Sequence, residues 1–169
     1  MTLPVVHLRA IEPEDLDDLY NIENDEQLWG IGETNVPYSR YLLHQYVACN
    51  TADIYADRQM RLMVENLEGE TVGIIDLVNF EPRHLRAEIG IVIDKRHRRK
   101  GYAQATILHV ETYARDILHL HQLYAIVGLD NEPSLNLFNR LHFQPTATLR
   151  DWLFDGKRYA DAKLFQTFL

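Results

Sequence analysis

The order of strand-like and helix-like segments predicts a mixed α/β (α+β) fold with a central sheet of about seven strands. Apolar and polar side chains alternate along residues 60–65 and 87–93, which is typical of strands. Apolar side chains recur every three or four positions over residues 103–117, which is typical of a helix. Residues 122–128 form another apolar, strand-like run. Because a helix joins the strands 87–93 and 122–128, they are expected to be parallel neighbours through a right-handed crossover.

The remaining segments complete the predicted order. Residues 5–10 read as a short strand, and Pro13 with its acidic neighbours suits the first turn of a helix. Ser39 is the expected N-cap of a second helix, with Leu42, Leu43, Tyr46 and Val47 facing inward. A loop or broken helix is expected at 23–37, a weak linker at 50–57, a buried strand at 71–80, a helix at 131–141, and strands at 148–154 and 159–168. No domain boundary is visible, so we expect one domain over residues 1–169.

Bulk composition restricts the class of protein. The chain has 169 residues, of which 46% are hydrophobic and 25% charged, as expected of a globular domain. A net charge of −8 argues against nucleic-acid binding, which needs a basic face. Cys49 is the only cysteine, which favours a reducing compartment. The first residues lack the pattern of a secretory signal, and no apolar run approaches the ~20 residues of a membrane span. The sequence therefore predicts a cytoplasmic protein that does not bind a membrane.

A basic turn lies between the strand at 87–93 and the helix at 103–117. Arg98, Arg99 and Lys100 precede Gly101, where the helical pattern begins. The first N–H groups of a helix are unpaired and suit phosphate, and glycine lets a phosphate approach the main chain. From these residues alone, a pyrophosphate site and a solvated basic turn remain alternatives. The dinucleotide pattern GxGxxG and the Walker pattern GxxxxGK[ST] are both absent here.

The spacing Arg98-x-x-Gly101-x-Ala103 resembles the signature (Q/R)-x-x-G-x-(G/A) of the Gcn5-related N-acetyltransferases, the GNAT superfamily. The resemblance implies the GNAT fold, in which the parallel strands splay around acetyl-CoA (coenzyme A). It also implies that the turn binds the pyrophosphate and that the preceding strand lies along the pantetheine arm. The residues implied in cofactor binding here are Ile91, Val92, Ile93, Arg98, Arg99, Lys100, Gly101, Tyr102 and Ala103.

A second motif, NEPSLNLFNRLHF at residues 131–143, is similar to the GNAT pattern N-x-x-(S/A)-x-x-L-(Y/F)-x-x-x-G-F. The resemblance implies cofactor contacts for Asn131, Ser134 and Phe138. Asn131 is also a good helix N-cap, and both roles can hold together. There are two departures from the pattern. His142 replaces the glycine that ends the helix in a left-handed conformation, and Phe138 replaces a tyrosine proposed to protonate the leaving thiolate.

Three further segments resemble the spermidine acetyltransferase and ribosomal-protein acetyltransferase branch of the superfamily. They are HLRAIEPEDL at 7–16, HLHQLYAIV at 119–127 and DGKRYADAKLF at 155–165. The resemblance thus covers nearly the whole chain. It implies an acetyl-CoA-dependent N-acetyltransferase acting on a primary amine, with a small polyamine-like cation favoured. A protein N-terminal amine as acceptor, or an acyl-CoA-binding module of low activity, remain alternatives.

The chemistry of acetyl transfer needs a base, because a primary amine of pKa about 10.4 is about one part in a thousand neutral at pH 7. Glu88, in the strand beside the expected thioester, is the candidate catalytic base and substrate contact. A solvent-facing role or an ion pair with Arg83 or Arg86 is the alternative. A main-chain N–H within residues 91–93 could stabilise the thioester oxygen if the strand bulges there.

Acidic and amide side chains define the expected acceptor site. Asp76 interrupts the apolar run VGIIDLV, and it either pairs within the protein or awaits a cation. Folding the hairpin places Asp76 and Asn79 on the strand beside Glu88. Glu33 belongs to an acidic loop, with Glu23, Asp25 and Glu26, that is either a collar for a cationic substrate or a solvated loop.

Two expectations concern metals and partners. The histidines show no tight ligand spacing, so no metal is predicted. The apolar C-terminal strand at 159–168 favours a homo-oligomer, at least a dimer.

Overall fold

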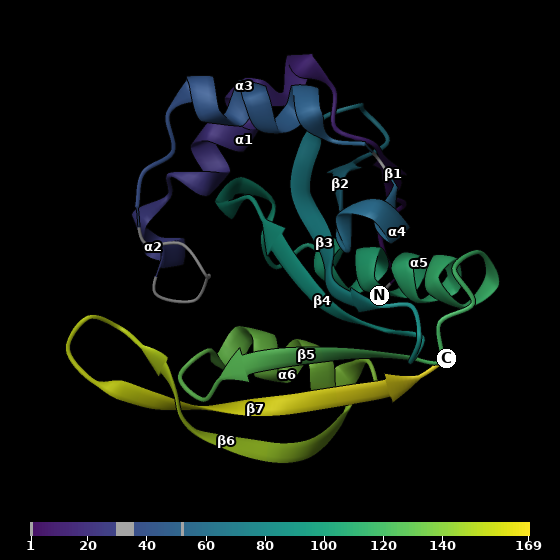
Figure 1. The fold of residues 1–169 in the computed structure, drawn as a ribbon, viewed down its shortest axis with the longest axis vertical. Coiled ribbons are helices and arrows are strands. Elements are labelled where there is room, and N and C mark those ends of the chain that lie inside the picture. The colour runs from purple at the N-terminus through teal and green to yellow at the C-terminus, as the bar shows by residue number, and fades with distance from the viewer. Residues whose placement is uncertain (1, 30–35, 52) are drawn as a thin grey trace.

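A computed structural model describes residues 2–29, 36–51 and 53–169. Within these residues, seven strands form one mixed sheet in the order β1-β2-β3-β4-β5-β7-β6 (Figure 1). The strands are β1 (His7–Arg9), β2 (Met60–Glu65), β3 (Thr71–Glu81), β4 (Arg86–Ile93), β5 (Gln122–Gly128), β6 (Gln144–Phe154) and β7 (Tyr159–Phe168). The sheet is antiparallel apart from the β4–β5 pair, which is parallel as predicted.

The helices of the described residues are α1 (Leu16–Glu23), α2 (Glu26–Trp29), α3 (Arg40–Cys49), α4 (Ile54–Asp57), α5 (Tyr102–Asp116) and α6 (Glu132–Arg140). Two single-turn 3₁₀ helices, η1 (Pro13–Asp15) and η2 (Lys95–His97), precede α1 and α5. The predicted linker at 50–57 in fact contains α4, because the Asp53 side chain accepts a hydrogen bond from the Tyr55 N–H and caps a helical turn. Strand β6 begins four residues earlier than predicted.

Two layers of helices cover the two faces of the sheet. Helices α5 and α6 pack on one face, where Val110 and Phe138 meet Leu123 of β5. Helices α1 and α3 pack on the other face over β2 and β3, where Leu19 meets Met63. The alternation along residues 60–65 suggests a strand with one exposed face, but this expectation is wrong, because the adjacent residues Met63 and Val64 are buried in different layers. Complete burial of a side chain such as Leu19 contributes about 2 kcal/mol.

The helix α3 begins as predicted, with the Ser39 hydroxyl accepting a hydrogen bond from the Leu42 N–H at 3.1 Å. Two of the expected inward positions are wrong. Leu42 lies on the outer side of α3, and Ile117, at the C-cap of α5, is exposed because the helical turn ends there.

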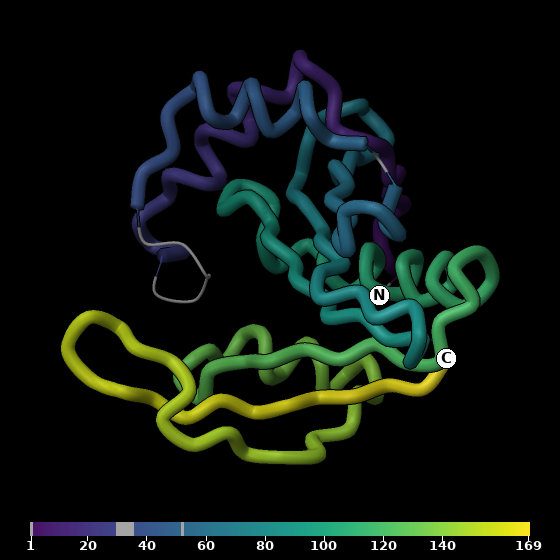
Figure 2. The backbone as a smooth tube through the Cα atoms, in the orientation of Figure 1, coloured from purple at the N-terminus to yellow at the C-terminus, as the bar shows by residue number. Residues whose placement is uncertain are grey.

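The parallel strands β4 and β5 stay together for only three residue pairs and then diverge. Their pairs are Arg86 with Gln122, Ala87 with Leu123, and Glu88 with Tyr124. Beyond Glu88 the two strands separate, and the gap between them is visible in both backbone views (Figures 1 and 2). The sheet is thus forked, and Glu88 with Tyr124 forms the last pair before the fork.

The expected bulge within residues 91–93 is wrong. The β3–β4 register runs without interruption from the Gly73–Ile93 pair to the Val78–Glu88 pair. The irregularity lies instead at the other end, between Val78 and Glu81 of β3. Separately, none of the helices in the described ranges is long and apolar enough to cross a membrane.

Candidate active site

The turn before α5 presents an uncapped helix N-terminus beside basic side chains. Asp94 begins the turn, because its carboxylate accepts a hydrogen bond from the Arg96 N–H at 2.8 Å. Arg98, Arg99 and Lys100 are exposed, and α5 then runs for 15 residues from Tyr102. No side chain caps α5 at Gly101, so the first N–H groups of the helix remain available to an anion.

Glycine at position 101 is required by both conformation and space. Gly101 has a φ of 90°, in the left-handed region that L-residues with side chains disfavour. A Cβ at this position would lie 3.0 Å from Pro4 Cδ and 3.4 Å from Leu3 Cδ2. The N-terminal segment therefore packs against the turn and fixes its shape.

The free edge of β4 beyond the fork offers main-chain groups to the gap. The Asp94 N–H donates to the Val72 carbonyl at 2.9 Å, so Asp94 and every second residue before it face β3. By the same alternation, Ile91 and Ile93 direct their N–H and C=O groups away from β3. In agreement with this, the Ile93 carbonyl accepts a hydrogen bond from the Arg98 Nε at 2.9 Å. The fork supplies the free N–H that the sequence led us to expect from a bulge.

The helix α6 begins at Asn131, as predicted. The Asn131 Oδ1 accepts a hydrogen bond from the Ser134 N–H at 3.2 Å, and so the amide caps the helix. Phe138 differs from expectation, because its ring is only 4% exposed and lies 5.0 Å from Phe143 and 5.8 Å from Phe165. This ring belongs to the buried core cluster that also contains Phe143 and Phe165.

Glu88 lies at the fork among hydrogen-bond donors. Alternation along β4 places it on the face opposite Ala87 and Ile89, which are buried under α5. The Asn79 Nδ2 donates to the Glu88 Oε2 at 2.9 Å. The Tyr124 hydroxyl lies close enough to the side chains of Glu88 and Asn79 for both to act on its pKa. Burial raises the pKa of Tyr124, and the charge of Glu88 raises it further, so the phenol remains protonated at neutral pH.

Asp76 is paired within the protein, which decides between the two alternatives left open by the sequence. The Arg61 guanidinium donates to both Asp76 carboxylate oxygens, at 2.7 and 2.9 Å, and also to Glu23 at the end of α1. Burial alone would lower the pKa of Arg61, but the hydrogen bonds and charges of these carboxylates raise it above its usual value. Asp76 and Glu23 are thus already paired with Arg61 and do not form an unoccupied binding site for a substrate cation.

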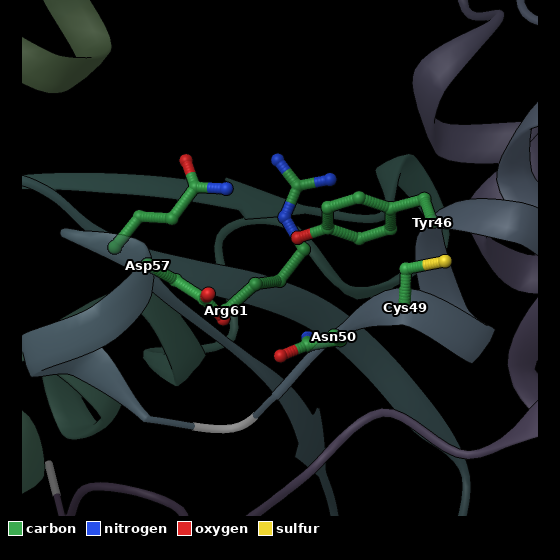
Figure 3. Close-up of a pocket in the computed structure, with 6 residues that line it drawn as sticks. Tyr46, Cys49, Asn50, Asp57 and Arg61 are labelled. Atoms are coloured by element: carbon green, nitrogen blue, oxygen red, sulfur yellow. The ribbon is translucent and has the colours of Figure 1, made fainter.

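A pocket of about 210 Å³ lies beside this ion pair, on the α3 side of the sheet (Figure 3). The Tyr46 ring stands next to the Arg61 side chain, with 5.8 Å between its centroid and the guanidinium carbon. The pocket is lined by Tyr46, Cys49, Asn50, Asp57, Gln59 and Arg61. None of these lining residues is among the candidate site residues that the sequence motifs identified.

The sequence reasoning thus places Glu88 and Asn79 together correctly, but it missed Arg61 and Tyr124. The sequence offers one indication of a role for them: each carries a polar end group but lies among apolar residues of a strand. Glu33 lies outside the described residues.

Comparisons with known proteins identify the family of this chain. The family model described as "Acetyltransferase (GNAT) domain" matches residues 6–144, and the chain belongs to this family. The predicted fold and the predicted class of enzyme, an N-acetyltransferase, are therefore confirmed.

Particular relatives are more informative about the branch. A spermidine N(1)-acetyltransferase of Vibrio cholerae is 27% identical over 156 residues, which cover 92% of this chain and 88% of that protein. A crystal structure of spermidine N-acetyltransferase from Vibrio cholerae in complex with CoA and spermine superimposes with a TM-score of 0.87 at 26% identity, covering 96% and 95% of the two chains. A dodecameric structure of spermidine N-acetyltransferase from the same organism gives a TM-score of 0.81 at 26% identity, covering 96% and 93%.

Proposed function

We propose that this chain transfers the acetyl group of acetyl-CoA to a primary amine of a small polyamine-like cation. The observation that carries the proposal is the Glu88 carboxylate at the last β4–β5 pair before the fork. The family assignment supports the reaction, and the spermidine N-acetyltransferase relatives support the acceptor.

The fork and the basic turn fit coenzyme A. The N-terminus of α5 and the charges of Arg98, Arg99 and Lys100 would hold the pyrophosphate, with Gly101 giving the turn its left-handed backbone conformation. Tyr102 and Ala103 supply the first helical N–H groups to the same anion. When bound, acetyl-CoA supplies an activated acyl group with a thiolate leaving group.

The edge of β4 and the start of α6 would hold the rest of the cofactor. The outward N–H groups of Ile91 and Ile93 and the outward C=O of Ile91 suit the amides of the pantetheine arm, and Val92 keeps the strand in register against β3. Asn131 has its Oδ1 engaged by the Ser134 N–H, which leaves the amide N–H₂ as a donor toward the arm. Phe138 supports α6 from the core.

The acceptor ammonium loses one proton to solvent before it attacks, and a second proton leaves the nitrogen as the C–N bond forms and the C–S bond breaks. Glu88 accepts this proton, and the N–H of Ile91 stabilises the carbonyl oxygen as it gains charge. Phe138 has no proton to return to the thiolate, so water supplies it. Glu88 passes the proton of the amine to solvent, and solvent supplies the proton of the thiol, so that the reaction balances.

The acceptor site is assigned to the face of the sheet that carries Glu88. Arg61 pairs with both Asp76 and Glu23, and Glu88 is the carboxylate that we assign to the amine. Gly90, paired with Asp76, has no side chain, and a Cβ there would meet only Asp76 Cβ at 3.8 Å. The missing side chain at Gly90 leaves space on the same face of β4 as Glu88, and this space suits a narrow, unbranched amine. Glu33 and Asn79 complete the proposed acceptor residues.

We also propose that the protein acts in the cytoplasm as a homo-oligomer, at least a dimer. The edge strand β6 is largely exposed, and Trp152, Phe154 and Tyr159 of the β6–β7 hairpin are each more than half exposed. An apolar edge of this kind needs a cover. The dodecameric relative supports assembly of copies.

The test is acetyl-CoA-dependent thiol release against spermidine, spermine, amino acids, aminoglycosides and short peptides. Glu88→Gln removes the base with little change of shape, and Glu68→Gln, in the exposed β2–β3 turn, is the matched control. Turnover on a polyamine that is lost in Glu88→Gln and kept in the control supports the proposal. Turnover on peptides alone assigns a protein N-terminal acceptor. Tight acetyl-CoA binding without turnover on any amine assigns an acyl-CoA-binding module.

A further inference from the structure

The Glu88 carboxylate is held from two neighbouring strands at the point where the sheet divides. Glu88 and Tyr124 are the last paired residues of β4 and β5. In a parallel pair, residues in register project from the same face, so the phenol and the carboxylate meet on one side of the sheet. Tyr124 lies within the segment 119–127 that resembles the acetyltransferase branch, but the sequence motifs assign this side chain no role.

A backbone irregularity brings a third side chain to the same place. Between Val78 and Glu81, β3 has two intervening residues, whereas β4 has only Ala87. The extra residue explains why Leu77 and Phe80, three positions apart, are both buried under α5. Asn79 is the residue in the left-handed region, with a φ of 51°, and its amide reaches Glu88.

Strain of this kind persists only where the surroundings impose it, and it is concentrated at functional sites. Asparagine is among the side chains that tolerate the left-handed region best. The bulge therefore turns Asn79 onto the carboxylate at a modest cost in stability.

We propose that Tyr124 and Asn79 are positioning residues that orient Glu88 at the fork and keep it ionised for the acceptor amine. The inference deepens the proposed function and rests on the role of Glu88 given there. Donors to the ionised carboxylate favour that form, and a phenol that stays protonated at neutral pH remains a donor. Among the described residues, the other charged groups around this cluster are Arg86 on β4, whose charge acts on Tyr124, and Asp76 on β3, which is paired with Arg61.

Two variants separate positioning from structural support. Tyr124→Phe removes the hydroxyl and keeps the ring. Asn79→Gly removes the amide donor and relieves the left-handed strain, so this variant is expected to be as stable as the wild type or more so. Tyr113→Phe, on the partly buried side of α5, is the matched loss of a phenol away from the fork.

The primary measurement is the ¹³C NMR titration of the Glu δ-carboxyl, with the Glu88 resonance assigned by its loss in Glu88→Gln. We expect the Glu88 midpoint to rise by about one pH unit in Tyr124→Phe and in Asn79→Gly, and to stay unchanged in Tyr113→Phe. An unchanged midpoint in both fork variants would overturn the inference. This readout needs no acceptor, so it decides the inference even if the proposed acceptor is wrong.

Steady-state kinetics supply the second readout. With a polyamine acceptor, each fork variant is expected to lower kcat roughly tenfold, with the KM for acetyl-CoA within about twofold of the wild type. The acid limb of the pH–rate profile should move to higher pH in both variants. A loss of thermal stability with an unmoved acid limb would show a structural role alone. Absence of turnover in the wild type would refute the proposed function, while the NMR titration would still settle the role of Tyr124 and Asn79.

Discussion

Substitution of Gly101 by alanine tests whether the shape of the basic turn determines cofactor binding. The position has a φ of 90°, and a Cβ would lie 3.0 Å from Pro4 Cδ, tighter than ordinary contact. Placing a side chain in the left-handed region costs about 1 kcal/mol. Displacing the N-terminal segment adds a comparable amount, so we expect a loss of about 2 kcal/mol in the free energy of unfolding. For a chain of this length that corresponds to a fall in Tm of roughly 4–8 °C.

Gly69→Ala is the control that isolates the strain from the clash. Gly69 has a φ of 77° in the β2–β3 turn, and nothing lies within 4 Å of its would-be Cβ. Thermal unfolding by circular dichroism should therefore show a fall in Tm of only about 2–4 °C for this variant. Calorimetric titration should show acetyl-CoA binding at least about tenfold weaker in Gly101→Ala, and unchanged in Gly69→Ala. Equal losses of stability in the two variants, with unchanged affinity in both, would refute the reasoning.

Three further predictions concern stability. His142→Gly should raise the free energy of unfolding by about 0.5–1 kcal/mol in denaturant titrations, because His142 has a φ of 63° after α6; a loss would contradict the assignment of strain. Arg61→Leu leaves Asp76 and Glu23 partly buried without their shared partner and should cost about 3 kcal/mol. The triple variant that also carries Asp76→Leu and Glu23→Gln should recover most of this, and no recovery would show that the ion pairs are not the cause. Burial alone would raise the pKa of Asp15, but the hydrogen bonds from Arg9 and a backbone N–H hold the pKa below its usual value. The stability from this carboxylate is present above about pH 4 and is lost as the pH falls through the lower folded value, so the deficit of Asp15→Asn at pH 7 should shrink toward pH 3; a constant deficit would contradict this.

The sequence predicts the parts of the fold that depend on local patterns. The bounds predicted for β5, from its apolar run, and for β7 agree with the structure. The parallel β4–β5 pair follows from the helix between the strands, and the Asn131 cap from its position before an amphipathic segment. Each of these depends on residues close together in the chain.

The site details that failed depend on register between distant residues. Arg61 of β2 pairs with Asp76 of β3. The register of these two strands shifts between Val64 and Glu65, which lie between Arg61 and the hairpin turn, so counting back from the turn does not give this pair. Alternation alone therefore does not reveal which residues are opposite each other. The position of the bulge at Asn79 has the same origin, since an extra residue is visible only once both strands are paired.

Phe138 shows a different limit of motif reasoning. The motif assigns the position, but the direction of the ring is set by packing against Phe143 and Phe165. A side chain that keeps its place in a motif can thus serve the core.

The fork has a consequence for the energetics of the free protein. Past Glu88, the main-chain groups of Ile91 and Ile93 that face away from β3 have no strand beside them among the described residues. A sheet interrupted at its centre gives up ladder hydrogen bonds that an extended ligand bearing amides can restore. Amide protons at these two positions should exchange rapidly in the free protein and slowly with acetyl-CoA bound, and the apparent Tm should rise with cofactor concentration by mass action. The cellular supply of the acyl donor would then set how much of the enzyme is folded as well as how fast it works.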